Sequence, residues 1–151
     1  MKTAVIGIGN PLRRDDGIGI ILVEKLREEK LPNIDCIDAG SGGVQLLPFL
    51  SRYKRIILVD AVNFNAEPGN TKVFTLQEID GNHGNPLSAH MLDTIQIIKL
   101  YQELYGGKLE VTVFGIQPSD ITYGTNLSPI LEDKLFEIKE KLIELIESTM
   151  Q

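Results

Sequence analysis

Short apolar runs alternate with longer amphipathic segments along the chain. The apolar runs predict strands over residues 3–8, 33–38, 55–60 and 109–116. The run Ile56–Val59 is uninterrupted, which is typical of a strand buried on both faces. A weaker strand over residues 71–75 is predicted at an antiparallel edge. This alternation predicts a three-layer α/β/α sandwich around a mostly parallel sheet of roughly five strands.

The segments between the strands have the spacing of amphipathic helices. One helix is predicted to begin near Asp16, with Ile18, Ile21, Leu22 and Leu26 on its apolar face. A short helix after the flexible loop Gly40–Gly43 carries Val44, Leu47 and Leu50. Its Pro48 is compatible only with the first helical turn.

Two longer helices are predicted in the second half of the chain. Ser88 is expected to cap a helix that follows the polar loop Gly81–Pro86 and ends at Tyr105, where Gly106 and Gly107 stop it. Its apolar face is predicted to contain Leu92, Ile95, Ile98 and Leu104. Ser128-Pro129 begins the last helix, whose apolar stripe is Leu131, Leu135, Ile138, Leu142 and Leu145.

Bulk properties narrow the class of protein. The chain has 151 residues, and we expect a single domain over residues 1–151. A net charge of −6 and a pI near 4.9 would repel a nucleic-acid backbone. Because no apolar run approaches the ~20 residues of a membrane span, we expect no membrane partner. Met1-Lys2 leads directly into the first strand without a cleavage site, so we expect the protein in the cytoplasm.

The single cysteine, Cys36, excludes an intrachain disulfide and a thiolate-rich zinc site. It lies in the alternating stretch of the second strand, which predicts a small buried hydrophobic side chain.

Polar side chains follow the predicted strands at the edge where open parallel sheets bind ligands. These are Asp15 and Asp16 after the first strand, Asp38 and Asp60 at the ends of the next two, Gln117 after the last, and His90 at a helix start. We therefore expect four carboxylates and a histidine to surround one crevice. The other histidine, His83, lies in a polar loop and is interpreted as solvated.

The first loop reads GIGNPLRRDDGIG over residues 7–19. A dinucleotide-binding turn would need a third glycine where Leu12 stands, and Asp15 and Asp16 would repel its phosphates. The glycines are better interpreted as shaping a tight turn. One of the two aspartates is expected to cap the following helix, which leaves the other free to point into the crevice.

Asp16, Asp60 and His90 offer two oxygen ligands and one nitrogen ligand around open coordination positions. This set suits a first-row divalent ion, and an open position is typical of a reactive metal site. The helix N-terminus is expected to keep His90 neutral, the form that binds metal. Simpler interpretations also exist, since Asp60 could form a strand-end turn and His90 a capping turn without a ligand.

Five short motifs lie in order along the chain: GIGNPLRRDDGIG, DAGSGG at 38–43, LVDAV at 58–62, SAH at 88–90 and GIQP at 115–118. Together they resemble the motifs of the NiFe-hydrogenase maturation endopeptidases, and the length of the chain also fits. Ser41 stands where threonine is more usual in that family.

The resemblance implies a three-layer α/β/α domain that removes the C-terminal extension of a hydrogenase large-subunit precursor. It also implies that nickel, presented by the precursor and not held permanently, is the recognition element. The metal-contacting positions of the family carry over onto Asp16, Asp60 and His90. Asp38 matches the loop beside the cleft. Asp16 and Asp38 are candidate general bases, whereas the metal could instead polarise the carbonyl or activate water.

Two other functions are compatible with the same residues. Ser41 lies among small residues and, with Asp60 and His90, has the chain order of a serine hydrolase, although no oxyanion-hole loop is evident. A non-catalytic nickel-sensing chaperone of the large subunit would use Asp16, Asp60 and His90 without cutting, because fold and ligands do not by themselves establish catalysis.

Overall fold

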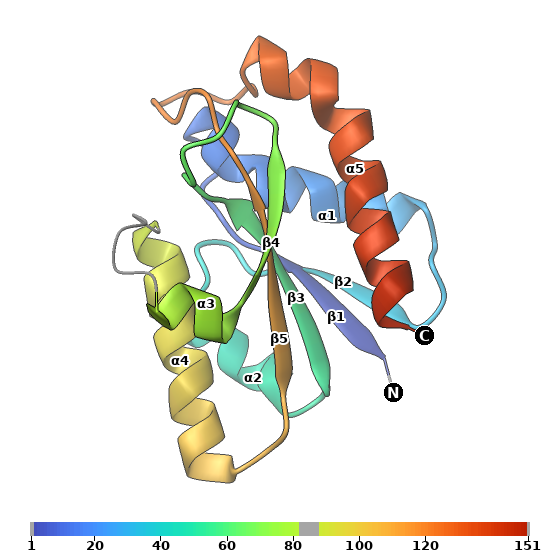
Figure 1. Ribbon diagram of the computed structural model, residues 1–151, viewed down its shortest axis with the longest axis vertical. Helices are drawn as coiled ribbons and strands as arrows, with labels where there is room; N and C mark the ends of the chain where they lie inside the picture. The colour runs from blue at the N-terminus through green and yellow to red at the C-terminus, as the bar shows by residue number, and fades with distance from the viewer. Residues whose placement is uncertain (1, 82–87, 151) are drawn as a thin grey trace.

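The computed structural model describes residues 2–81 and 88–150, and these form an α/β fold built on one sheet (Figure 1). The order of its strands is β2-β1-β3-β5-β4. They are β1 (Thr3–Gly7), β2 (Ile34–Asp38), β3 (Arg55–Ala61), β4 (Thr71–Thr75) and β5 (Glu110–Ile116). Each lies within a residue or so of its predicted bounds.

The sheet is parallel except at one edge. β1 pairs in parallel with β2 and β3, and β3 pairs in parallel with β5. β4 runs antiparallel to β5, with Phe74 opposite Val113, as the weaker strand pattern predicted. The five residues of β1 are all buried, as is typical of a strand covered on both faces.

Helices cover both faces of the sheet, which confirms the three-layer architecture (Figure 1). One face carries α1 (Ile18–Glu28) and α5 (Pro129–Thr149), and their aliphatic side chains share a core with β1, β3 and β5. The other face carries the 3-10 helix η2 (Gly43–Leu46), α2 (Leu47–Leu50), α3 (Leu76–Gly81) and α4 (Ala89–Tyr105). Pro48 lies in the first turn of α2, as expected. No helix in the described ranges is long and apolar enough to cross a membrane.

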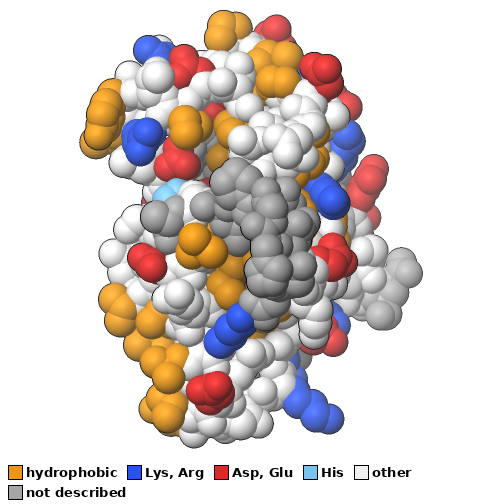
Figure 2. Space-filling model, turned by 60° about the vertical axis from the view of Figure 1, so that its left-hand side comes forward, with side chains coloured by type: hydrophobic (Ala, Val, Ile, Leu, Met, Phe, Trp, Pro, Cys, Tyr) orange, Lys and Arg blue, Asp and Glu red, His pale blue; other side chains and the backbone are white. Residues whose placement is uncertain are grey.

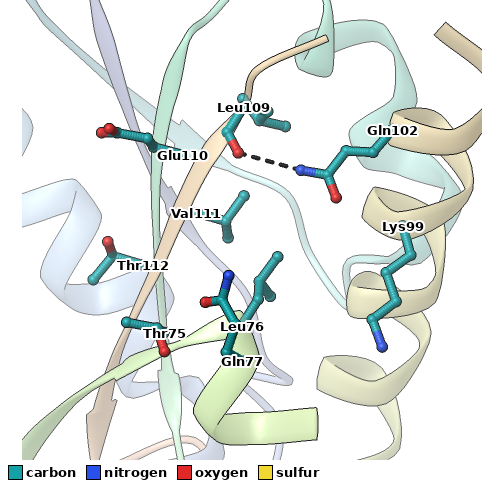
Figure 3. Close-up of a pocket in the computed structure, with 9 residues that line it drawn as sticks. All are labelled: Thr75, Leu76, Gln77, Lys99, Gln102, Leu109, Glu110, Val111 and Thr112. Atoms are coloured by element: carbon teal, nitrogen blue, oxygen red, sulfur yellow. Dashed lines mark hydrogen bonds between the residues drawn. The ribbon is translucent and has the colours of Figure 1, made fainter. Parts of the chain in front are cut away.

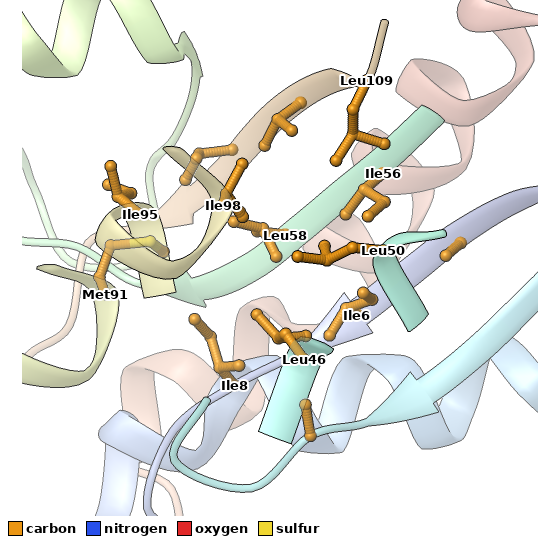
Figure 4. Packing of buried hydrophobic residues seen from close by; sticks show 14 of the residues in the cluster. Ile6, Ile8, Leu46, Leu50, Ile56, Leu58, Met91, Ile95, Ile98 and Leu109 are labelled. Atoms are coloured by element: carbon orange, nitrogen blue, oxygen red, sulfur yellow. The ribbon is translucent and has the colours of Figure 1, made fainter. Parts of the chain in front are cut away.

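The core beneath α4 consists mainly of aliphatic side chains (Figure 4). It includes Ile6 and Ile8, Leu46 and Leu50, Ile56 and Leu58, and Met91, Ile95 and Ile98 of α4. Burial of one such side chain contributes about 1.5–3 kcal/mol. These contacts therefore hold the first turn of α4, and with it His90, firmly against the sheet.

The predicted apolar face of α4 is partly wrong. Leu92 and Leu104 are 47% and 66% exposed, whereas Met91 is fully buried beside Ile95 and Ile98. The helix has apolar residues on both faces, so spacing alone could not define the buried one. The predicted helix ends are confirmed: the Ser88 hydroxyl accepts a hydrogen bond from Met91 N–H, and Gly106 takes the left-handed conformation.

The structure also differs in smaller ways from what the sequence predicted. Of the apolar positions predicted for the short helix, Leu50 is buried as expected, whereas Val44 and Leu47 are exposed and Leu46 is buried in their place. Cys36, expected to be buried, is half-buried and packs beside the core at the edge strand β2. The predicted loop Gly81–Pro86 overlaps the unpredicted helix α3 at Gly81, and residues 82–86 lie outside the described part.

Candidate functional site

Asp16, Asp60 and His90 meet at the carboxyl edge of the sheet. Asp16 lies in the 3-10 helix η1 (Arg14–Gly17) after β1, Asp60 lies near the end of β3, and His90 lies in the first turn of α4. One ligand atom from each lies within 4.8 Å of the other two. The fold therefore brings together the three residues that the sequence predicted as metal ligands.

Asp60 is the buried member of this group. Its side chain is 0% exposed, and its Oδ1 accepts a hydrogen bond of 2.8 Å from the N–H of Ala61. Its Oδ2 accepts one of 3.2 Å from Ser88 Oγ and lies 3.1 Å from His90 Nδ1. Burial raises the pKa of Asp60 to about 7, although His90 opposes that rise.

His90 lies between the two carboxylates. Its Nδ1 faces Asp60, and its Nε2 lies 3.2 Å from Asp16 Oδ1 and 3.3 Å from Asp16 Oδ2. Burial alone would lower the pKa of His90, but hydrogen bonds and charges from Asp16 and Asp60 raise it to about 10. The expectation that the helix N-terminus keeps His90 neutral is therefore wrong, because the two nearby carboxylates raise the pKa of its imidazole.

Asp16 is partly buried, with 13% of its side chain exposed. Burial would raise its pKa, but the hydrogen bond and charge of His90 lower it below the ordinary value. Its Oδ2 also accepts a hydrogen bond of 3.0 Å from Asn10 N–H. A Cβ on Gly9 would lie 2.0 Å from the Asp16 carbonyl oxygen, so the loop needs glycine at this position.

Ser88 belongs to the site as well as to the helix cap. Its hydroxyl lies 2.9 Å from His90 Nδ1 and donates to Asp60, so it helps to hold the His90 ring and the Asp60 carboxylate in place. The sequence assigned Ser88 only a capping role. The sequence signal that could have indicated this second role is the position of Ser88 two residues before His90.

The adjacent aspartate, Asp15, has a different role from the one predicted. It neither caps α1 nor points into the crevice: α1 has no side-chain cap, and Asp15 is fully buried. Its carboxylate accepts hydrogen bonds of 2.8–2.9 Å from the N–H groups of Ser119, Asp120 and Ser128 and from Ser128 Oγ. Ser128 therefore binds Asp15 and makes no side-chain cap on α5.

Gln117 is likewise structural. It is buried, and its Oε1 accepts hydrogen bonds from the N–H groups of Phe64 and Ala66. This contact fixes the loop after β3 and does not add a ligand to the group of three.

Asp38 lies at the end of β2 but outside the group of three. It is exposed, and its Oδ1 accepts a hydrogen bond of 2.9 Å from Gly40 N–H, which shapes the glycine loop. Its predicted role as a general base stays a prediction. His83 lies outside the described residues.

The geometry does not favour a serine hydrolase. Ser41 lines the same cavity as His90. However, the two ring nitrogens of His90 face Asp60 and Asp16, which leaves neither nitrogen to take a proton from Ser41.

A hollow of about 480 Å³ lies at the other end of the sheet (Figure 3). It is lined by the beginning of β5, α3 and α4, and Gln102 Nε2 donates a hydrogen bond of 3.2 Å to the Leu109 carbonyl there. It lies at the amino end of β5, whereas Asp60 lies towards the carboxyl end of the neighbouring parallel strand, so this hollow is separate from the candidate site.

The donor set fits a divalent metal ion. Two carboxylates and an imidazole provide oxygen and nitrogen ligands, and their close spacing lets them converge on one ion. An ion would have to displace the proton of His90, because only neutral imidazole is a ligand. Without a metal, the raised pKa of His90 keeps a proton on its imidazole, which lies between Asp16 and Asp60.

Comparisons with known proteins identify the family of this chain. The sequence family described as hydrogenase maturation protease matches residues 20–147. A putative hydrogenase maturation protease of Methanocaldococcus jannaschii is 34% identical over 145 residues, which cover 94% of this chain and 92% of that protein.

Solved structures have the same fold. The hydrogenase maturating endopeptidase HybD of Escherichia coli superimposes with a TM-score of 0.84 at 23% identity, covering 99% of this chain and 94% of that one. The NiFe hydrogenase maturation protease HybD of Thermococcus kodakarensis superimposes with a TM-score of 0.81 at 26% identity, covering 96% of this chain and 99% of that one. The chain therefore belongs to the hydrogenase maturation protease family, and as a member of it is a proteolytic enzyme.

Proposed function

We propose that this protein is the endopeptidase that removes the C-terminal extension of a NiFe-hydrogenase large-subunit precursor. In this proposal, Asp16, Asp60 and His90 recognise nickel that the precursor already holds. The observation that carries the proposal is the convergence of these three side chains at one edge of the sheet. Family membership supports the proteolytic part of the proposal, and the donor set supports the metal part.

Recognition would depend on an exchange between a proton and a metal ion. In the free enzyme, His90 carries a proton and bridges Asp16 and Asp60. A nickel ion presented by the precursor would replace that proton and satisfy both carboxylates. A precursor without nickel offers nothing to displace the proton, so it would bind less tightly at this site.

The chemistry at the peptide bond has two possible sources. A nickel ion at the site could polarise the scissile carbonyl or lower the pKa of a bound water. Alternatively, Asp16 or Asp38 could act as the general base. Asp16 is itself one of the three proposed metal ligands, whereas Asp38 is exposed at the end of β2 beside the glycine loop.

A processing assay tests the proposal. The large-subunit precursor, prepared with and without nickel, is incubated with the enzyme, and the released C-terminal peptide is identified by mass spectrometry. We expect cleavage only of the nickel-loaded precursor and loss of cleavage in His90→Ala. Glu103→Ala, an exposed change on the same helix, is the matched control and should cleave normally.

Two outcomes would contradict the proposal in different ways. Equal cleavage of both precursor forms would show that nickel is not the recognition element. Tight binding of the nickel-loaded precursor without release of a peptide would favour the nickel-sensing chaperone.

A further inference from the structure

A cavity of about 720 Å³ opens directly beside the candidate site. One wall consists of the glycine loop and η2, including Val44 and Gln45, and the other is the face of α4 that carries Gln96 and Leu100. His90 lines its end. We call this cavity the α4–η2 groove. In Figure 2, hydrophobic side chains gather on the surface below the pale-blue histidine, along the same side of the molecule.

The walls of the groove combine apolar side chains with amide groups and the carboxylate of Asp93. Val44 is 64% exposed and Leu100 is 46% exposed, so both present aliphatic surface to a ligand. Gln45 and Gln96 add carboxamides that can both donate and accept hydrogen bonds. A polypeptide in an extended conformation offers the matching groups, since its backbone needs hydrogen-bond partners and its side chains need pockets.

One buried hydroxyl links the α4–η2 groove to the candidate site. Thr94 is fully buried, and its Oγ1 donates a hydrogen bond of 2.7 Å to the His90 carbonyl. The same oxygen accepts one of 2.9 Å from Gly43 N–H. Both walls of the groove therefore hold a fixed position relative to His90, and a chain bound in the groove would be held in register with the site.

We infer that the α4–η2 groove binds an extended segment of the polypeptide substrate next to the bond that is cut. An apolar side chain of that segment lies against Val44 and Leu100. This inference rests on the proposed function. The occupant follows from continuity, because His90 belongs both to the candidate site and to the groove, and the family acts on polypeptide.

Substitutions that introduce a charged side chain into the groove test this inference. Leu100→Glu puts a carboxylate against the apolar segment, and we expect KM for the nickel-loaded precursor to rise about tenfold or more. The kcat at saturating precursor should change less than about twofold, since the change leaves Asp16, Asp60 and His90 intact. Val44→Asp, on the opposite wall, should have the same effect.

Leu104→Glu is the matched control. Leu104 is an exposed leucine one turn further along α4 and is not part of the groove lining. Normal kinetics for this variant, together with a raised KM for Leu100→Glu and Val44→Asp, would support the inference. If the wild-type enzyme is active and KM is unchanged in both groove variants, the inference that the groove binds substrate is overturned, while the proposed function stands. If the wild-type enzyme cleaves no precursor, both proposals fail.

Discussion

His90 should make the stability of the metal-free protein depend on pH, and replacing it should remove that dependence. The pKa of His90 is raised from 6.5 to about 10 because its imidazolium lies between Asp16 and Asp60. A group whose pKa is raised on folding stabilises the fold fully below its unfolded pKa. The stabilisation by His90 is therefore complete below pH 6.5 and is lost as the pH rises through about 10.

The size of the effect follows from the same contacts. A pKa rise from 6.5 to about 10 corresponds to at most about 5 kcal/mol of unfolding free energy. Two features reduce that value: the His90 side chain is itself 15% exposed, and burial raises the pKa of Asp60 to about 7, which weakens its negative charge near pH 6.5. We therefore expect His90→Ala to lower the free energy of unfolding by about 2 kcal/mol at pH 6.5.

Urea denaturation of the metal-free protein in the presence of a chelator measures this difference. The gap between wild type and His90→Ala should shrink to about 0.5 kcal/mol or less near pH 10, where the wild-type imidazole also loses its charge. His90→Gln keeps hydrogen-bonding capacity without a charge and should behave like His90→Ala. A gap that is the same at both pH values would refute the imidazolium assignment, because packing alone does not titrate.

Three further changes test other parts of the structure. Asp15→Ala should lower the free energy of unfolding by about 3–5 kcal/mol in urea denaturation, since its buried hydrogen-bond donors lose their acceptor; a loss below about 1 kcal/mol would contradict this. Gly42→Ala should cost about 2 kcal/mol in thermal unfolding, because a Cβ would lie 2.3 Å from Thr94 Oγ1 at a φ of +80°. Asp38→Asn should slow cleavage about 100-fold in the precursor assay, whereas a change in stability alone would assign Asp38 a structural role.

Much of the fold could be predicted because its strands have unambiguous patterns. The run Ile56–Val59 is buried on both faces, and β4 is the antiparallel edge that its weaker pattern indicated. Helix faces were harder to predict. α4 has apolar residues around its circumference, so only the packed structure shows that Met91 is buried and Leu92 is not.

The positions of the site residues could be predicted, but not their contacts. Strand ends in a parallel sheet place Asp16 and Asp60 at one edge whatever the details of packing. Adjacent residues in a 3-10 turn point in different directions, and the sequence could not decide that Asp15 turns inward while Asp16 reaches His90. The charge of His90 depends on distances to two carboxylates, which no spacing rule supplies.

The central claim is that Asp16, Asp60 and His90 bind the nickel held by the precursor. X-ray absorption spectroscopy at the nickel edge tests it most directly, on nickel-loaded precursor mixed with enzyme and frozen before the first turnover is complete. The account predicts additional oxygen and nitrogen ligands on nickel with wild-type enzyme and fewer of them with His90→Ala. A nickel spectrum that is identical with and without the enzyme would contradict the claim.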